Sequence, residues 1–252
     1  MEQNHPNGET EEVRRRYAKR QRIDWRYSVL NPAQQLPTQE RERVLCRMLR
    51  SQDWTRLNQI KVTDVGCGGA GNLLMLLRFG FAPENLTGIE LLVERYERAR
   101  QVLPPASRVI LGDATVASVE PASQDLVMQN LVFSTLLDLD FQQRLADAMW
   151  SWLRPGGAVI WHDFMFNNPR NKDTRGVPVS RIKELFPHGK IEQHRITLAP
   201  PISRLVTRIH PSLYTVFNAL PLLRTHILAW IEKPEGCPPH RTASGRSCPS
   251  PS

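Results

Sequence analysis

The stretch from Lys61 to Asn72 constrains the fold of this chain more than any other. An apolar run that ends near Asp64 leads into Gly66, Gly68 and Gly71, and a helix-like sequence follows at once. Glycine permits tight turns and close approach of a ligand to the backbone. The pattern therefore predicts a strand, a tight turn and a helix N-terminus over which a nucleotide-like ligand can lie.

A carboxylate at the end of the next apolar run supports this interpretation. Glu90 closes the run 86–90, and an acidic side chain in that position can accept two hydrogen bonds from a ribose diol. The chain then alternates between strand-like and helix-like segments, which is typical of a parallel sheet covered by helices. We expect strands near 60–65, 86–90, 107–111, 125–130, 157–162, 190–198 and 226–232, and helices near 70–80, 92–102 and 141–153.

The remaining segments surround one expected core domain, residues 38–233. A basic arm, 1–37, comes first: residues 1–10 read as disordered and 11–22 as a charged helix, and a second helix is expected over 38–51. Apolar residues recur at helical spacing on either side of Pro211, so residues 202–223 are expected to form an insertion of two amphipathic helices. The tail, 234–252, has the Pro, Ser and Arg content of a disordered segment.

Composition limits the class of protein but does not identify a binding partner. The formal net charge is +8 and the isoelectric point near 9.7, but much of the charge lies in the N-terminal arm, so it does not by itself indicate nucleic-acid binding. Four cysteines without paired spacing imply neither a zinc site nor a disulfide framework, and no metal is expected. The sequence shows no membrane-spanning run and no signal-peptide core, which predicts a cytoplasmic location.

Five short motifs together resemble the class I S-adenosylmethionine (SAM)-dependent methyltransferases. They are the segments 64–71, 88–90, 111–114, 124–127 and 153–157, and the resemblance extends over roughly residues 61–233. It implies a Rossmann-like α/β fold with a seven-stranded, mostly parallel sheet, an antiparallel last strand and helices on both faces. It also implies SAM as the cofactor and S-adenosylhomocysteine as the product.

The resemblance assigns cofactor roles to individual positions of this sequence. Asp64 is expected to orient the glycine loop or receive the ammonium group, Glu90 to bind the ribose, and Asp113 and Ala114 to contact the adenine ring. The complete set of expected cofactor-binding residues is Asp64, Gly66, Cys67, Gly68, Gly71, Asn72, Glu90, Leu91, Asp113, Ala114 and Asn130. A nicotinamide dehydrogenase shares the glycine loop and the ribose-binding acid, but explains neither Asp113 nor the Arg-Pro-Gly-Gly turn at 154–157.

Candidates for catalysis follow the fourth and fifth predicted strands, because ligands bind at the carboxyl ends of parallel strands. His162 has a neutral form that can accept a proton near pH 7, and Asp163 could orient it or act as the base itself. The choice between the two stays open at this stage. A His-Asp pair that merely satisfies backbone groups of a loop is an equally simple interpretation.

The sequence indicates the methyl acceptor less clearly than the cofactor. The segments around Phe133, His162, Asn167, Thr197 and Leu222 are similar to methyltransferases of polysaccharide biosynthesis clusters, which suggests oxygen of a saccharide, a glycan or another small hydroxylated acceptor. An RNA methyltransferase and a non-catalytic SAM-binding scaffold are the alternatives. The segment 129–132 lacks the signature of exocyclic-amine methyltransferases, which argues against nucleic acid. The oligomeric state is not predicted, and the insertion with the basic arm suggests peripheral contact with a membrane.

Overall fold

A computed structural model describes residues 8–19, 25, 28–52, 54, 56–168 and 171–236. One seven-stranded sheet organises them, with strand order β3-β2-β1-β4-β5-β7-β6. The strands are β1 (Val62–Val65), β2 (Leu86–Glu90), β3 (Arg108–Leu111), β4 (Gln124–Asn130), β5 (Leu153–Phe164), β6 (Lys190–Leu198) and β7 (Arg224–Glu232). The first five pair in parallel and β7 is antiparallel to both of its neighbours, which confirms the predicted Rossmann-like sheet.

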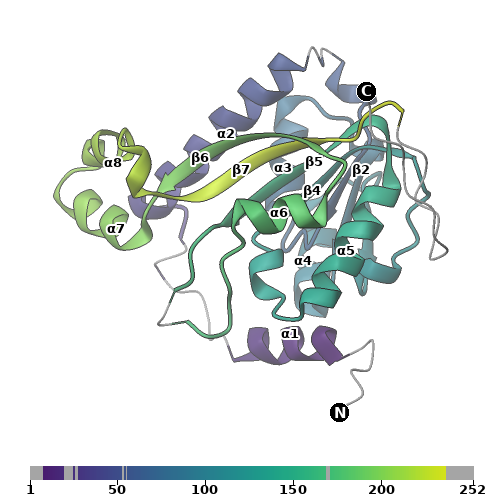
Figure 1. Cartoon of the computed structure of the whole chain (residues 1–252), viewed down its shortest axis with the longest axis horizontal. Helices are drawn as coiled ribbons and strands as arrows, with labels where there is room; N and C mark the ends of the chain where they lie inside the picture. Colours follow the sequence, from purple (N-terminus) through teal and green to yellow (C-terminus); the bar gives the residue numbers. More distant parts are fainter. Residues whose placement is uncertain are drawn as a thin grey trace.

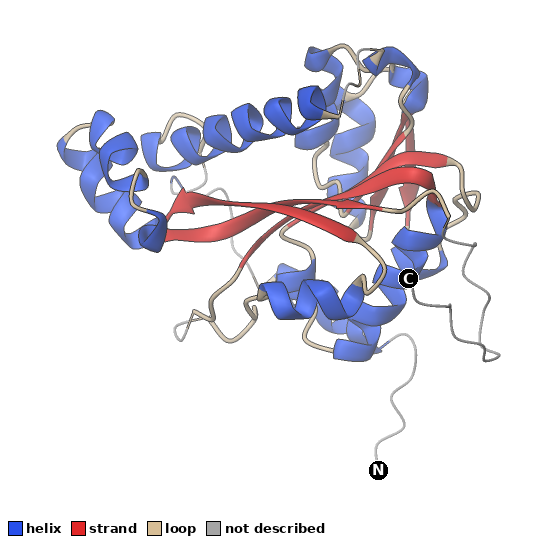
Figure 2. Ribbon diagram, turned by 45° about the horizontal axis from the view of Figure 1, so that its top comes forward, coloured by secondary structure: helices blue, strands red, loops and turns tan. Residues whose placement is uncertain are grey.

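Helices cover both faces of the sheet (Figures 1 and 2). On one face lie α2 (Pro32–Ser51), α3 (Gly71–Phe79) and α4 (Val93–Val102), and their apolar side chains share a buried cluster with the strands. On the other face lie α5 (Leu139–Trp152) and α6 (Val179–Leu185), around Trp161 and Phe133. Near-continuous apolar burial in β1 and β4 follows from this cover, because central parallel strands are shielded on both faces.

The N-terminal helices differ from the predicted boundaries. The charged helix expected over 11–22 is α1 (Gly8–Ala18), and the helix expected over 38–51 begins at Pro32. Asn31 caps that earlier start by accepting a hydrogen bond from Ala33 N, with Pro32 in the first turn, where proline is favoured. The predicted disorder of residues 1–10 is wrong for residues 8–10, which form the first turn of α1. Residues 1–7 and most of the tail, 237–252, lie outside the described residues.

Two further short helices, α7 (Pro200–Ile209) and α8 (Ser212–Asn218), connect β6 to β7 at one end of the sheet (Figure 1). Pro37 explains one of the contacts that anchor them. A proline inside a helix has no N–H to donate to the carbonyl four residues earlier, here that of Ala33. That carbonyl instead accepts a hydrogen bond from Ser203 Oγ of α7, at 3.4 Å.

Further features of the described part of the chain bear on the sequence predictions. The short helix α6 was not predicted, and β5 begins at Leu153, so the Arg154–Gly157 segment is part of the strand with a register shift beside it. The structure also has 3-10 turns at Ala114–Val116, directly after Asp113, and at Phe133–Thr135. No helix in the described ranges has the length and apolar character needed to cross a bilayer.

Candidate active site

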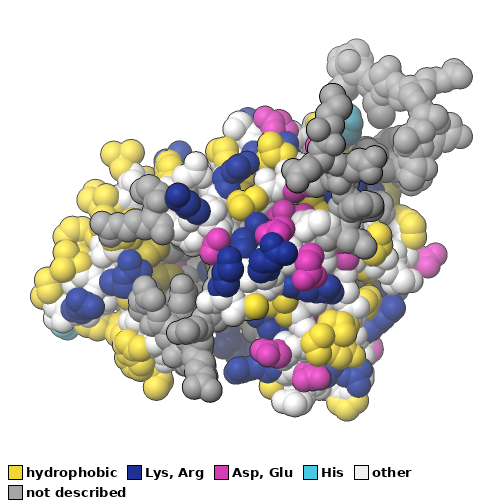
Figure 3. Space-filling view, turned by 90° about the horizontal axis from the view of Figure 1, so that it is seen from below, with side chains coloured by type: hydrophobic (Ala, Val, Ile, Leu, Met, Phe, Trp, Pro, Cys, Tyr) yellow, Lys and Arg dark blue, Asp and Glu magenta, His cyan; other side chains and the backbone are white. Residues whose placement is uncertain are grey.

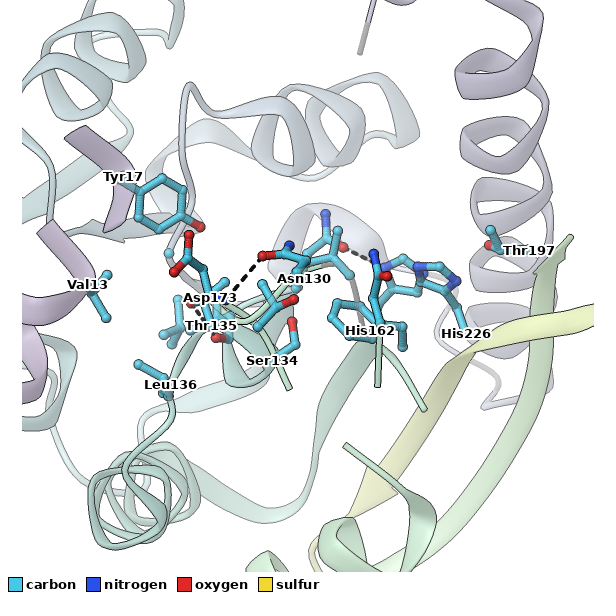
Figure 4. A pocket seen from close by; sticks show the side chains of 18 of the residues that line it. Val13, Tyr17, Asn130, Ser134, Thr135, Leu136, His162, Asp173, Thr197 and His226 are labelled. Atoms are coloured by element: carbon cyan, nitrogen blue, oxygen red, sulfur yellow. Dashed lines mark hydrogen bonds between the residues drawn. The ribbon is translucent and has the colours of Figure 1, made fainter. Parts of the chain in front are cut away.

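A large cavity opens at the carboxyl ends of the parallel strands (Figure 4). Its volume is about 2070 Å³, well above the roughly 300–1,000 Å³ of most small-molecule sites, so it has room for more than one ligand. The ends of β1, β2, β4 and β5 form its floor, while residues of α1, α2 and α7 form its walls. The N-terminal residues of β7 also reach it, because an antiparallel strand begins at the edge where its parallel neighbours end.

The glycine loop makes the turn that its sequence predicts. Gly66 and Gly68 have φ values of +64° and +57°, a region that side-chain-bearing residues rarely occupy. A Cβ atom at Gly66 would stand only 2.6 Å from Cγ2 of Val132. Glycine at position 66 is therefore required both by the backbone conformation and by the close approach of the loop after β4.

Glu90 connects this loop to the end of β2. One oxygen of its buried carboxylate accepts a hydrogen bond from Gly68 N at 2.8 Å, and the other accepts one from Leu92 N at 2.9 Å. Hydrogen bonds to a charged acceptor are strong, so the carboxylate is held in a fixed orientation at the cavity wall. Each oxygen retains a lone pair, which fits the expected role of accepting from ribose hydroxyls.

Asp64 lies beneath the loop and is fully buried. Burial is the main cause that raises its pKa to about 7, while the hydrogen bond from the Asn72 amide and the nearby charge of Arg41 act in the opposite direction. Arg41 itself lines the cavity from α2, and burial lowers the pKa of its guanidinium. A cationic group thus faces the ligand space beside a carboxyl group that titrates near neutral pH.

Helix α1 contacts Asp113 and forms part of the cavity wall. Asp113 Oδ1 accepts hydrogen bonds from the N–H and hydroxyl of Thr115, and Oδ2 accepts one from Thr10 of α1 at 2.9 Å. Inside α1, Arg16 pairs with Glu9 at 2.6 Å and donates to the carbonyl of Thr135 at 3.0 Å. The arm is consequently part of the cavity wall, through contacts that sequence analysis did not reveal.

His162 occupies the floor between β4 and β7, and Figure 4 shows it beside Asn130 and His226. Its Nδ1 lies 2.5 Å from Asn130 Oδ1. An amide oxygen can only accept, so Nδ1 carries the proton and Nε2 is left with a lone pair. Nε2 is buried and has no hydrogen-bond partner among the described residues, which is rare for a buried polar atom.

The environment keeps this imidazole neutral. Burial lowers the pKa of His162 well below its ordinary value, and the charge of Arg41 lowers it further. The His226 ring stacks on it at 5.4 Å between centroids, and burial lowers the pKa of His226 to about 4. A neutral imidazole with an unpaired lone pair can accept a hydrogen bond or a proton, and its lowered pKa makes it a weaker base than an exposed histidine.

Asp163 points away from this arrangement. Successive side chains of a strand alternate between faces, so His162 and Asp163 lie on opposite sides of β5. The Asp163 carboxyl accepts hydrogen bonds from the backbone N–H groups of Ser134 and Phe164, at 3.0 and 2.9 Å. Burial raises its pKa to about 7. Its position suits holding the loop after β4 rather than contacting a ligand.

The other expected site residues divide into two groups. Those that line the cavity are Gly66, Glu90, Leu91, Asp113, Ala114, Asn130 and His162. The described lining does not include Asp64, Cys67, Gly68, Gly71, Asn72 or Asp163. Of these, Asp64, Cys67, Asn72 and Asp163 are buried, whereas Gly68 and Gly71 belong to the glycine loop itself. Burial beside Asp64 and Glu90 raises the pKa of the Cys67 thiol, so it is not a reactive nucleophile.

The cavity lining also includes residues that were not predicted as site residues from the sequence, among them Thr10, Arg41, Thr197 and His226. The position of His226 could have been predicted, because an antiparallel last strand must begin at the ligand-binding edge of the sheet. The position of Arg41 could not, since only tertiary packing shows which side of α2 faces the cavity. Across the described ranges, no group of three or more His, Cys, Asp or Glu side chains is arranged to hold a metal ion.

Comparisons with known proteins agree with this geometry. Residues 63–161 match a family model described as a methyltransferase domain. A comparison with curated proteins gives no significant match. Among solved structures, a SAM-dependent methyltransferase from Archaeoglobus fulgidus is 13% identical with a TM-score of 0.54, covering 76% of this chain and 94% of the other.

Two further structures share the fold. A SAM-dependent methyltransferase from Mesorhizobium loti is 15% identical with a TM-score of 0.54, covering 70% of this chain and 93% of the other. Phosphoethanolamine N-methyltransferase 1 from Haemonchus contortus, in complex with phosphoethanolamine and S-adenosylhomocysteine, is 15% identical with a TM-score of 0.64, covering 94% and 52%. The chain therefore has the Rossmann-like fold of SAM-dependent methyltransferases, and the domain match at residues 63–161 supports SAM as its cofactor.

Proposed function

We propose that this chain is a SAM-dependent methyltransferase that methylates an oxygen of a saccharide, a glycan or another small hydroxylated acceptor. The observation that carries the proposal is the neutral His162, whose Nδ1 is bonded to Asn130 and whose Nε2 has no partner among the described residues. A hydroxyl must lose its proton when it is methylated, whereas an unprotonated amine needs no base. A base at the cavity wall is therefore most useful with a hydroxyl acceptor.

The residues around the glycine loop fit the cofactor. Glu90 presents fixed acceptors that would bind the ribose hydroxyls. Asp113 would accept from the adenine amino group, and Arg41 would supply a cation for the carboxylate of the methionine part. When bound, SAM supplies an electrophilic methyl group on a positively charged sulfur. The size of the cavity leaves space beside the cofactor for an acceptor, next to His162.

The chain's own residues then perform two tasks. Asn130 fixes the tautomer of His162, so that Nε2 would take the proton of the acceptor hydroxyl. Bound SAM would supply the methyl group to that oxygen and would leave as S-adenosylhomocysteine once its bond from sulfur to the methyl carbon is broken. Asp163 holds Ser134 and Phe164, and through them the loop and strand end that border the acceptor space. Asn167, Thr174, Thr197 and Thr225 line that space with polar side chains suited to hydroxyl-rich acceptors.

A labelling experiment with a matched histidine control tests this proposal. Wild type, His162→Asn and His188→Asn are incubated with methyl-labelled SAM and a fractionated glycan extract; His188 is exposed and remote from the lining. We expect label in a base-stable product, a loss of about 100-fold or more in turnover for His162→Asn, and no change for His188→Asn. SAM affinity, measured by calorimetry, should stay within about threefold in both variants.

Two results would contradict the proposal in different ways. If folded wild type binds neither SAM nor S-adenosylhomocysteine, the cofactor assignment fails. If His162→Asn transfers label as fast as wild type, the base assignment fails while the cofactor assignment stands. Label in RNA that is lost on nuclease treatment would instead favour the nucleic-acid alternative.

A further inference from the structure

The α7–α8 hairpin exposes large apolar side chains in addition to those that it buries. The side chains buried against the body of the protein are Ser203, Val206, Tyr214 and Asn218. The side chains that face solvent include large apolar ones: Leu205, Ile209, Val216, Phe217, Leu220 and Leu222, with exposed fractions from 37% to 89%. A helical pair that is stable in water normally buries its apolar side and exposes its polar side. An exposed apolar cluster of this kind marks an interaction surface.

The orientation of the hairpin is held by a hydrogen-bonded cluster around Glu40. Glu40 of α2 is buried and accepts hydrogen bonds from Tyr214 OH and Asn218 Nδ2 of α8, each at 2.7 Å, and from Thr197 N of β6 at 3.0 Å. Rotating the hairpin to bury its exposed apolar side would remove the two donors of α8 from this buried carboxylate, which is costly. The apolar side chains therefore stay directed outward.

The charge around this surface has one sign. Between Glu192 and Glu232 the sequence contains no acidic residue, while Arg195, Arg204, Arg208 and Arg224 lie in that interval. The Arg224 guanidinium donates to the backbone carbonyls of Asn218 and Arg195. Figure 3 shows hydrophobic and basic side chains gathered at the end of the molecule where Figure 1 places α7 and α8.

This combination identifies the kind of partner. Exposed apolar side chains surrounded by arginines match a bilayer interface. The apolar side chains can insert among the acyl chains, and the arginines can pair with anionic headgroups. A second copy of this chain would place arginines against arginines across a symmetric interface, which like-charge repulsion disfavours. We propose that the α7–α8 surface, defined by the six exposed apolar residues named above and these four arginines, docks on an anionic phospholipid bilayer.

Docking there would also orient the cavity. The first turn of α7 contributes Pro200, Pro201, Ser203 and Arg204 to the cavity wall. A protein resting on its α7–α8 surface therefore has its cavity beside the headgroup layer. This goes beyond the proposed methyl transfer: it predicts binding to the bilayer with or without cofactor, and it places any acceptor at the membrane surface.

Vesicle flotation of the full chain tests the proposal. Wild type is floated with vesicles of phosphatidylcholine alone or of phosphatidylcholine with phosphatidylglycerol, and compared with Leu205→Ser/Ile209→Ser/Val216→Ser and with Arg195→Gln/Arg208→Gln. We expect wild type to bind the anionic vesicles at least about tenfold more tightly, since each arginine near such a surface contributes roughly a fivefold factor. Both variants should lose about tenfold or more, and binding should weaken when salt is raised from about 0.1 M to 1 M.

Controls separate this outcome from misfolding and from failure of the proposed function. Val102→Ser/Leu139→Ser removes exposed apolar side chains elsewhere and should float like wild type. Far-UV circular dichroism and thermal unfolding of the same samples report whether each variant is folded, independently of cofactor binding. The proposal is overturned if folded wild type stays with the soluble fraction, if the triple variant floats equally well, or if wild type is a dimer that only the triple variant dissociates.

Discussion

The two halves of the cavity differ in how their polar groups are bonded. In the glycine-loop half, formed by the ends of β1 to β3, the carboxyl groups of Asp64, Glu90 and Asp113 all accept hydrogen bonds from the protein itself. In the histidine half, formed by the ends of β5 to β7, His162 Nε2 has no partner among the described residues. The first half is preorganised for one ligand, whereas the second keeps an unsatisfied acceptor that a ligand hydroxyl can use.

Backbone strain is distributed differently as well. Positive φ values in the glycine loop fall on Gly66 and Gly68, where they cost little, and on Ala70. In the histidine half, Thr197 has φ +66°, although a β-branched residue is unfavourable there. Such strain persists where surrounding contacts impose it, and here Glu40 holds Thr197 N. The comparison predicts that substitutions in the first half mainly affect cofactor affinity and those in the second affect proton transfer or stability.

The largest expected effect lies in the glycine-loop half. Glu90→Ala removes the acceptor of Gly68 N and Leu92 N together with the expected ribose contact. The two hydrogen bonds that the ribose diol would donate to this charged acceptor are worth about 3 kcal/mol or more. Their loss should lower the affinity for S-adenosylhomocysteine at least about 100-fold. Calorimetry measures this, with Glu97→Ala, an exposed carboxylate of α4, as the matched control. Affinity within about threefold of wild type would show that Glu90 holds only the loop.

The dependence of stability on pH distinguishes two buried groups of the histidine half. Asp163 has a folded-state pKa of about 7, above its unfolded value, so its contribution is present at low pH and lost as pH rises through about 7. His226, with a folded-state pKa of about 4, contributes stability above its unfolded pKa and loses it as pH falls through about 4. Between about pH 4 and pH 6.5 these two dependences oppose each other.

Asp163→Asn should expose the histidine dependence. Relative to wild type, the free energy of unfolding of the variant should rise with pH by about 1 kcal/mol per unit between about pH 4.5 and pH 7. Urea unfolding at a series of pH values measures this difference, and Asp147→Asn, an exposed carboxylate of α5, should run parallel to wild type. Parallel profiles for Asp163→Asn would mean that the Asp163 carboxyl is solvated in solution.

These differences explain what the sequence could and could not reveal. The fold and the glycine-loop half rest on local signals: glycines at fixed spacing, an acid at each strand end, and alternation of strands and helices. The histidine half is assembled by contacts over long sequence distances, such as Asn130 with His162 and Glu40 with Tyr214 and Thr197. His162 and Asp163 are adjacent in sequence, yet strand alternation separates them, which a stricter use of the two-residue period would have predicted.

The smallest expected effect concerns the strain at Thr197. Thr197→Gly and Thr197→Ala both remove the hydroxyl group and the branch at Cβ. Only glycine, which has no Cβ, is relaxed at φ +66°. The glycine variant should therefore be more stable than the alanine variant by about 1 kcal/mol, measured by urea unfolding at fixed pH. The Glu40 contact uses the backbone N–H and is kept in both variants, so the difference isolates the backbone conformation. Equal stability of the two variants would show that the chain relaxes to negative φ at this position, and that the histidine half is no more strained than the glycine loop.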